Sequence, residues 1–427
     1  MTLSETTVRR SFDAAAQSWC RLRSDHQLRR RLLRELQQRR DGRSDLVQFD
    51  VIEHGDRWET LAVRNELLVR TEILGSAAAR KAVADLRLQA VPVRCLDGRV
   101  SRLVGSEDTG GVDKLLREAV ARGLSGSVNH VARMGGVVMK GGSVPTWAPA
   151  RSAFPLKAGS AVRGPVVAIL DTGIDARSRS DGWLADLVTA ENVEPVDAVP
   201  ADGERDPGAG HGTFVAGVAQ QVTPGADVRM YRVLDAEGLG SEVGVACATL
   251  RAAADGAAII NLSLGTYSVD DAQPVAFQVA LELLAERYPD VLVVAAAGND
   301  GGDRPCWPAA FPDVVAVGGL TGDLRESEWS NHGDWVTCST VGERIVSTYI
   351  EGRRAGGLGV EPAEFGPDAW ACWTGTSFAA PQIAAAVAAR CTAEPGLTPR
   401  QALDALLAEG QPVPGFGQAL CLLSGAP

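Results

Sequence analysis

The sequence has few of the features that mark membrane or nucleic-acid-binding proteins. It has no run of about 18 apolar residues, so no transmembrane helix is expected. No apolar core long enough for a secretory signal lies before Arg21. We therefore expect a cytoplasmic protein, with secretion by another route left open. The net charge of −11 argues against nucleic acid as the main partner.

Cysteine and aromatic residues are also informative by their scarcity and placement. The eight cysteines are scattered, and no two of them form a CxxC pair. Without an export signal, free thiols are a better expectation than disulfides. Aromatic residues make up only 5% of the chain, whereas glycine and alanine are abundant, which suits tightly packed layers of helix on sheet. The 427 residues have room for two or three domains.

Residues 1–45 form a basic arm. They hold eleven arginines against six acidic residues, a net charge of +5 that leaves −16 for the rest of the chain. Leu28, Leu32, Leu33 and Leu36 form an apolar stripe at helical spacing. We expect an amphipathic helix that docks on the protein's own acidic body. An arm that binds a partner is the alternative.

Residues 46–130 are predicted to form a small α+β domain. In order, the pattern gives a strand at 61–71, a helix at 76–88, a hairpin at 91–95 and 99–104, a helix at 112–122 and a last strand at 128–132. This order is typical of a ferredoxin-like unit. Residues 131–162 contain several glycines and prolines and are interpreted as a linker.

Residues 163–427 alternate apolar runs with helical patterns. The runs lie at 165–170, 228–233, 259–263, 291–296 and 314–317, and the helical patterns at 212–221, 241–255 and 274–287. Continuous apolar strands separated by helices predict a parallel sheet covered by helices on both faces. Thr398-Pro399 caps a final helix that ends at Glu409.

An acid and a histidine stand at two of the junctions in this pattern. Asp171 follows the apolar run at 165–170, at the edge of the sheet where sites of open α/β proteins gather. His211 lies between Gly210 and Gly212 at the start of a helix. Taken alone, each residue would more often be a helix cap or a satisfied polar group.

A serine and an asparagine complete the set. Residues 374–381 read Thr-Gly-Thr-Ser-Phe-Ala-Ala-Pro, which places Ser377 among small residues at the start of a helix, where free N–H groups can stabilise negative charge. Its plain alternative is a tight turn into a buried helix. Asn299 lies in Ala-Ala-Ala-Gly-Asn-Asp-Gly at 295–301, where it could be only a turn former.

Together these four motifs resemble the subtilisin family of serine endopeptidases over about residues 163–425. Asp171, His211 and Ser377 occur in the family's order, 40 and 166 residues apart. The resemblance implies that Ser377 is the nucleophile, His211 the general base and Asp171 its orienting acid. It implies that Asn299 donates to the oxyanion. It also implies the subtilisin-like α/β fold and a protein or peptide substrate.

The resemblance also implies where an extended substrate binds. Two segments would hold it as an added strand, and two would form the walls of the pocket for the residue before the cleaved bond. The residues concerned are Gly238, Leu239, Gly240, Ser263, Leu264, Gly265, Ala296, Ala297 and Gly298, with Cys306 near the base of the pocket. Asp300 and Asp303 lie near its rim, so a preference for Arg or Lys and a preference for a medium-sized apolar residue both stay open.

The sequence departs from the family pattern in places. After the helix that begins at His211, the chain moves directly to the strand at Val228, without the calcium-binding insertion of many subtilisins. We therefore expect no required cofactor and no metal site there. Gln382 follows the serine motif where the family often has His, and Asp175 and Cys372 are interpreted as structural.

The domain at 46–130 resembles a subtilisin propeptide in its position and element order. The resemblance implies a self-inhibited zymogen, whose processing site lies in 131–162. A permanent regulatory domain is the alternative. For the whole chain we expect a serine endopeptidase, against a catalytically silent scaffold with a protease fold. An esterase is less consistent with the serine motif, which is not Gly-x-Ser-x-Gly.

Overall fold

The fold was analysed in a computed structural model of the chain. The structure describes residues 26–55, 58–106, 110–134, 144–148, 164–185, 187–198, 202–224, 226–354, 361–423 and 425. Most of the predicted basic arm and of the predicted linker, including Cys20, lies outside the described residues. No helix among the described residues is long and apolar enough to cross a membrane.

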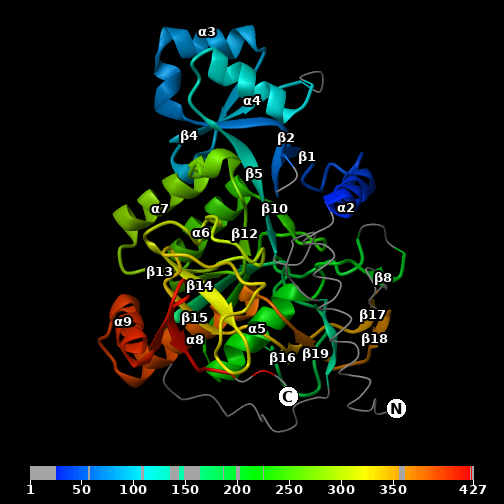
Figure 1. The fold of residues 1–427 in the computed structure, drawn as a ribbon, viewed down its shortest axis with the longest axis vertical. Helices are drawn as coiled ribbons and strands as arrows, with labels where there is room; N and C mark the ends of the chain where they lie inside the picture. The colour runs from blue at the N-terminus through cyan, green and yellow to red at the C-terminus, as the bar shows by residue number, and fades with distance from the viewer. Residues whose placement is uncertain are drawn as a thin grey trace.

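An eight-stranded sheet forms the centre of the larger unit, the protease body, in the order β20-β21-β15-β14-β13-β11-β7-β9 (Figure 1). The strands are β7 (Val166–Asp171), β9 (Val228–Arg232), β11 (Ala257–Leu262), β13 (Leu292–Ala296), β14 (Val314–Leu320), β15 (Cys338–Val341), β20 (Gln411–Val413) and β21 (Gly417–Leu420). All neighbouring pairs are parallel except β20 and β21. Each of the five apolar runs overlaps one of these strands, which confirms the predicted parallel sheet.

Helices pack on both faces of the sheet, because alternate residues of each strand belong to two different hydrophobic cores. The helices of the body are α5 (His211–Val222), α6 (Glu242–Ala254), α7 (Val275–Arg287), α8 (Ala380–Ala393) and α9 (Pro399–Glu409). Val167, Ile259 and Val294 pack in one core with residues of α8 and α9. Their neighbours Ala168, Ile260 and Val293 belong to the core that contains residues of α6 and α7. Side chains that alternate between the two faces of each strand therefore place one layer of helices on each face of the sheet.

The N-terminal unit is a small sheet with two helices on it, and its strand β5 joins it to β10 and β12 of the protease body. Its elements are β1 (Phe49–His54), β2 (Trp58–Arg70), η1 (Thr71–Gly75), α3 (Ala77–Asp85), β3 (Gln89–Pro92), η2 (Arg94–Leu96), β4 (Val100–Val104), α4 (Val112–Ala121) and β5 (Ser127–Met134). The strand order β5-β2-β4-β3, all antiparallel, is that of a ferredoxin-like unit, with β1 added beside β2. Leu67, Leu103 and Leu115 lie in its core.

Short strands complete the fold, and strand residues also lie within the predicted linker. β6 (Thr146–Ala148) pairs with β19 (Trp370–Trp373), which also pairs with β16 (Ile345–Thr348). β8 (Glu204–Arg205), β17 (Gly352–Arg354) and β18 (Ala363–Phe365) form a small sheet. β10 (Leu239–Ser241), β12 (Leu264–Gly265), η4 (Val269–Asp271) and η5 (Thr376–Phe378) are the remaining elements. The interpretation of all of 131–162 as loop is wrong, because β5 continues to Met134 and β6 lies inside this range.

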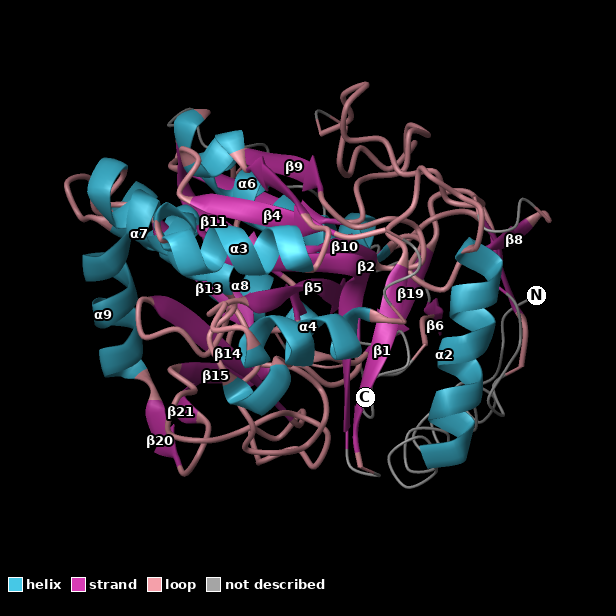
Figure 2. Cartoon of the chain, turned by 90° about the horizontal axis from the view of Figure 1, so that it is seen from above, coloured by secondary structure: helices cyan, strands magenta, loops and turns pink. Residues whose placement is uncertain are grey.

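The basic arm contains the helix α2 (His26–Arg40), which lies to one side beside β1 (Figure 2). Leu33 and Leu36 of the predicted stripe are buried. Arg39 and Arg40 bind the carboxylate of Glu237 in the protease body, at 2.8 and 2.9 Å. The helix therefore docks on the acidic body, as the charge distribution predicted.

The prediction of free thiols is wrong for one pair of cysteines. Cys95 of η2 and Cys247 of α6 form a disulfide, with their Cα atoms 5.5 Å apart. The spacing of 152 residues gave no signal of this pairing, because it depends on how the two units dock. Cys306, Cys338, Cys391 and Cys421 have free thiols.

Candidate active site

Asp171 and His211 come from different elements that meet at one edge of the central sheet, and Ser377 lies in a third element next to Phe378, whose ring packs against His211. Asp171 ends β7, His211 begins α5, and Ser377 is the middle residue of η5. The glycines beside His211 allow this close approach. Gly210 has a φ of +82°, and a Cβ on Gly212 would lie 2.1 Å from the carbonyl oxygen of Gly173.

Asp171 and His211 form a buried pair. The imidazole Nδ1 of His211 lies 2.8 Å and 3.0 Å from the two carboxylate oxygens of Asp171, and both side chains are fully buried. The backbone N–H of Thr172 donates to the same carboxylate at 2.7 Å. This pair fixes Nδ1 as the protonated nitrogen and leaves Nε2 to act as an acceptor.

The serine hydroxyl is close to this pair but bonded elsewhere. Ser377 Oγ donates to the carbonyl oxygen of Ser263 at 3.2 Å. His211 Nε2 is buried and has no hydrogen-bond partner among the described residues. The His211 ring packs against the rings of Trp373 and Phe378, each 5.4 Å away between centroids. The imidazole is therefore held in place on the apolar side while its second nitrogen is left unpaired.

Asn299 is held so that its amide N–H₂ group is the unpaired end. Its Oδ1 accepts from the backbone N–H and from the hydroxyl of Thr376, both at 2.9 Å. Its Nδ2 is buried without a partner among the described residues. The hydroxyl of Thr376 also accepts from the Gly298 N–H at 3.1 Å. Thr376 thus orients the side chain of Asn299 immediately beside Ser377.

Glu194 supports the site, and sequence reasoning missed it. It is buried, and both of its carboxylate oxygens accept from the backbone N–H of Gly210 at 3.0 Å. Burial raises the pKa of Glu194 well above its usual value, although bonds from Thr172 and Gly210 oppose this shift and Asp171 adds to it. Its loop carries no motif, so only the fold reveals that it supports the start of α5.

The two segments predicted to hold a substrate strand are already paired with the chain itself. β5 runs antiparallel between β10 and β12 (Figure 1). Leu239 is opposite Arg133, Gly240 is opposite Ala132, and Leu264 is opposite Met134. The N–H of Met134 donates to the carbonyl of Gly238 at 3.0 Å. The last strand of the N-terminal unit thus occupies the predicted place of the substrate.

The predicted specificity pocket is narrow. Ala296, Ala297 and Cys306 are buried. A Cβ placed on Gly265 would lie 2.5 Å from the sulfur of Cys306, and one placed on Gly298 would lie 3.2 Å from the same sulfur. The Cys306 side chain therefore fills the space between the two predicted walls. Burial raises the pKa of its thiol to about 12, so Cys306 is a neutral packing group.

Other residues singled out from the sequence have structural contacts. Asp175 pairs with Arg177 at 2.7 Å, and the buried amide of Gln382 donates to the carbonyls of Phe378 and Val341 at 2.7 and 2.8 Å. Cys372 is buried in β19. The Nδ1 of His130 lies 2.6 Å from the carboxylate of Glu242, where it joins β5 to α6.

The structure offers no fitted cation site in the part that it describes. α5 runs without interruption from His211 to Val222, and β9 begins at Val228. No group of three or more His, Cys, Asp or Glu side chains in the described ranges is arranged to hold a metal ion. The expectation that no cofactor is required stays a prediction.

Comparison with known proteins decides the family. Residues 162–412 match the description "Subtilase family". This match covers more than half of the chain. The chain belongs to the subtilase family. The family match, together with the sheet and helices described above, confirms the subtilisin-like α/β fold.

Several relatives of this subtilase are known. It is 32% identical over 232 residues to a "Thermophilic serine proteinase" of Bacillus sp. (strain AK1), covering 52% of this chain and 50% of that one. It is 30% identical over 231 residues to "Thermitase" of Thermoactinomyces vulgaris, covering 52% of this chain and 72% of that one. The chain spans half the length of the first of these relatives.

A solved structure extends the likeness to most of the chain. Fervidolysin from Fervidobacterium pennivorans superposes with a TM-score of 0.56 at 18% identity, covering 88% of this chain and 62% of the other. At this identity the likeness concerns the fold alone. The coverage exceeds the share matched by the sequence relatives.

Proposed function

We propose that this subtilase is a serine endopeptidase made in a self-inhibited form. The observation that carries the proposal is a pair of buried, unpartnered polar atoms, His211 Nε2 and Asn299 Nδ2. Asn299 bonds Thr376 and His211 packs on Phe378, the residues on either side of Ser377. Leaving a buried polar atom unpaired costs about 1–3 kcal/mol, which is understandable where a reaction supplies the missing partner.

The four residues have distinct roles in the proposed reaction. Ser377 Oγ attacks the scissile carbonyl while His211 Nε2 takes its proton, and the acyl-enzyme forms as His211 protonates the leaving amine. Asp171 holds the imidazole and stabilises its charged form. Asn299 Nδ2 and the backbone N–H of Ser377 donate to the oxyanion. Water then releases the acyl group by the same steps in reverse order.

Self-inhibition is supported by the strand that lies between β10 and β12. A substrate would have to add there as an extended strand, and β5 already makes those backbone bonds. Since β5 is paired through Met134, we propose that processing occurs after this residue, within 135–143. These residues lie outside the described part of the chain. The sequence there begins Gly135-Gly136.

We further propose that the enzyme prefers a small residue before the cut. The Cys306 sulfur occupies the space between Gly265 and Gly298, which limits the length of any side chain that enters. The glycines after Met134 would satisfy this limit. Asp300 and Asp303 are partly and fully exposed at the rim, so we place the selectivity in size rather than in charge.

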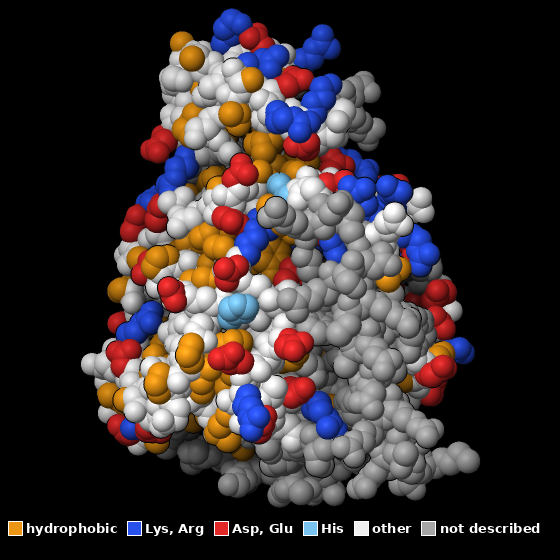
Figure 3. Space-filling model, in the orientation of Figure 1, with side chains coloured by type: hydrophobic (Ala, Val, Ile, Leu, Met, Phe, Trp, Pro, Cys, Tyr) orange, Lys and Arg blue, Asp and Glu red, His pale blue; other side chains and the backbone are white. Residues whose placement is uncertain are grey.

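The alternative function is a silent scaffold that keeps the protease fold. A scaffold would gain nothing from the buried Asp171–His211 contact or from the fixed orientation of Asn299, so this function is not favoured. The proposed partners are a protein or peptide substrate and the chain's own N-terminal unit as inhibitor. On the face shown in Figure 3, acidic and basic side chains are interspersed over both units, without a continuous basic surface that would suit nucleic acid.

The cytoplasmic location expected from the sequence stays a prediction. The Cys95–Cys247 disulfide weighs against it, because cytosolic thiol systems keep most cysteines reduced. Fractionating the source cells and detecting the chain with an antibody would decide between a cytoplasmic and an exported protein.

A fluorophosphonate probe tests the proposed activity. The wild-type chain, Ser377→Ala and the control Ser178→Ala are each incubated with the probe and then separated by mass. Wild type and Ser178→Ala should take up one label and shorten by a cut within 135–143. Ser377→Ala should stay unlabelled and full length. Failure of the wild type to take up label, with or without prior limited proteolysis and a reducing agent, contradicts the proposal.

A further inference from the structure

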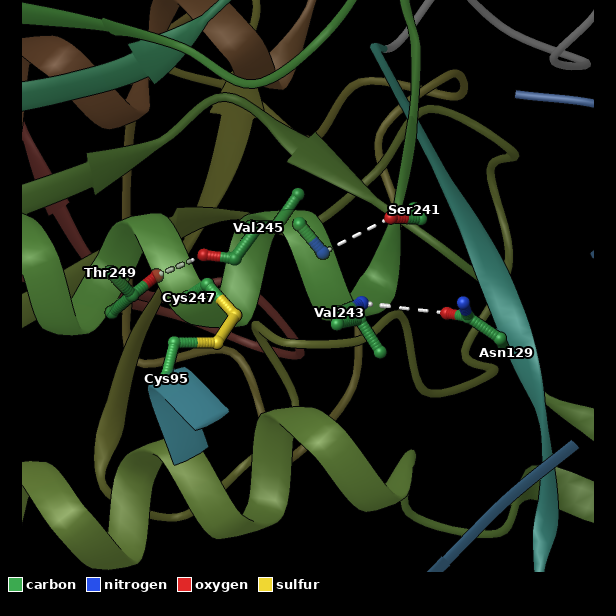
Figure 4. Close-up of a disulfide and its surroundings, with 8 residues drawn as sticks. Cys95, Asn129, Ser241, Val243, Val245, Cys247 and Thr249 are labelled. Carbon is green, nitrogen blue, oxygen red and sulfur yellow. Dashed lines mark hydrogen bonds between the residues drawn. A yellow bond between two sulfur atoms is a disulfide. The ribbon is translucent and has the colours of Figure 1, made fainter. Parts of the chain in front are cut away.

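The disulfide joins the two units of the molecule. Cys95 belongs to η2 of the N-terminal unit, and Cys247 belongs to α6 of the protease body (Figure 4). In the sequence, the only peptide connection between these units passes through residues 135–163. If the chain is cut there, this disulfide becomes the covalent link between the inhibitory strand and the body.

The disulfide lies where the two units touch. η2 packs against both α6 and α7. At the first turn of α6, the Val243 N–H donates to Asn129 Oδ1 of β5 at 3.4 Å (Figure 4). The same helix carries Glu242, whose carboxylate lies 2.6 Å from His130 of β5. Thus α6 holds both the disulfide and two contacts to the inhibitory strand.

Around the disulfide, exposed ion pairs surround a buried apolar contact, because Val93, Leu96 and Val100 of the N-terminal unit belong to the same hydrophobic core as residues of α6 and α7. Arg99 binds Glu286 through two bonds of 2.7 Å, Arg70 binds Glu282, and Asp97 binds Arg287. These side chains are between 28% and 51% exposed. Exposed pairs contribute little and are screened by salt, so the buried contacts and the disulfide are what hold a cut unit in place.

We propose that Cys95–Cys247 is a redox latch that keeps the cut N-terminal unit over the active site, so that activation requires both cleavage and reduction. This inference rests on the proposed function. A cut unit without the latch is diluted into solution when it dissociates. With the latch, it stays at an effective concentration on the order of millimolar, and β5 returns to its place between β10 and β12.

The latch can be reached by a reductant. Cys95 is exposed, and Cys247 is half-buried. A thiolate of an external dithiol attacks the sulfur of Cys95, and Cys247 leaves as a thiolate that takes up a proton. The second thiol of the dithiol then displaces Cys95 and closes its own ring. Two electrons pass from the dithiol to the cystine, and the products are two protein thiols and one cyclic disulfide.

The test compares four states of the full chain: uncut or cut within 135–143, each with and without dithiothreitol. A chromogenic peptide with alanine before the scissile bond reports activity, and a fluorophosphonate reports access to Ser377. The cut, oxidised form should run as one band on a non-reducing gel and have low activity. Reduction of the cut form should raise activity by about tenfold or more, whereas reduction of the uncut form should not.

Variants separate the latch from other thiol effects. The double variant Cys95→Ser with Cys247→Ser should become active on cleavage alone, whatever the reductant. The matched control Cys391→Ser with Cys421→Ser changes two free cysteines and should keep the response of the wild type. Where self-cleavage is slow, a recognition site for a protease of another class, inserted between Gly141 and Gly142, supplies the cut.

Two results would overturn the latch while the proposed function stands. One is a cut, oxidised form as active as the reduced form. The other is a reductant response that persists in the double variant. If no state takes up the fluorophosphonate, the proposed function fails first and the latch fails with it.

Discussion

The active site and the junction between the two units hold their polar groups in different ways. At the site, Asp171, His211 and Asn299 are fully buried and are fixed by short hydrogen bonds to neighbouring residues. At the junction, exposed arginines meet carboxylates around the buried pairs of Arg40 and His130, with one disulfide and one shared strand beside them. Buried bonds keep one geometry, whereas exposed pairs respond to salt and solvent. The junction can therefore open while the site keeps its shape.

Among the variants considered, Asn299→Ala should have the largest effect, which is a loss of catalytic rate. It removes the buried Nδ2 donor, together with the Oδ1 that accepts from Thr376 at the start of η5. We expect kcat of the cut, reduced enzyme to fall by about 10²–10³, with KM little changed. Steady-state kinetics on the peptide substrate measure this.

Asn192→Ala is the matched control for that variant. Asn192 is also buried, but its amide donates to the loop carbonyl of Leu187 at 2.8 Å, away from Ser377. It should lower the melting temperature and leave kcat within about twofold. Equal losses of kcat in both variants would show that Asn299 acts through stability alone.

Arg40→Met tests a strongly buried charge cluster at the junction. Arg40 is 1% exposed and bonds Asp235 and Glu237, and Glu237 is fully buried. Burial raises the pKa of Glu237 even though two arginines lower it. Removing Arg40 should destabilise the docked state by about 3 kcal/mol, which thermal or urea unfolding of the Ser377→Ala chain would measure.

Arg31→Met serves as the control for the junction. Arg31 is 69% exposed and pairs with Glu35 across one turn of α2 at 3.5 Å. Its loss should change the unfolding free energy by no more than about 0.5 kcal/mol. A large loss in both variants would mean that α2 is sensitive to any substitution, and the comparison between buried and exposed charge would not hold.

Cys306→Gly should change specificity and leave the catalytic groups untouched. The substitution removes the sulfur that lies between Gly265 and Gly298 and so deepens the pocket. We expect the ratio of kcat/KM for phenylalanine over alanine before the cut to rise by about 10–100-fold. The matched Cys338→Ala variant, which alters another buried thiol in the sheet, should keep the original ratio. An unchanged ratio in Cys306→Gly would refute the size limit.

The sequence predicted the protease body closely, because its signals are local. Five apolar runs overlap strands, and Asp171 and His211, 40 residues apart, form the predicted contact. The features that the sequence did not predict depend on packing between distant segments. Glu194 has no motif, Thr376 is one small residue among several, and Cys95 meets Cys247 only because the units dock. The last strand of the N-terminal unit was also predicted to end too early, at residue 132, whereas β5 continues to Met134. Its last residues pair with the protease body rather than with their own unit.

Glu194→Gln should give the smallest effect, and its sign follows from the raised pKa of Glu194. In the folded chain burial favours the neutral carboxyl, whereas in the unfolded chain the group ionises above about pH 4.5. The stability contributed by Glu194 is therefore present below pH 4.5 and is lost as the pH rises toward the folded pKa. Glutamine cannot ionise, so the variant should gain on the wild type by up to about 1.4 kcal/mol per pH unit in this window. Urea unfolding between pH 4 and 8 in the Ser377→Ala background measures the difference, with exposed Glu361→Gln as the control that should follow the wild type. A difference between Glu194→Gln and wild type that stays constant with pH would mean that the carboxyl beside the start of α5 is ionised, and that the site tolerates a second buried negative charge next to Asp171.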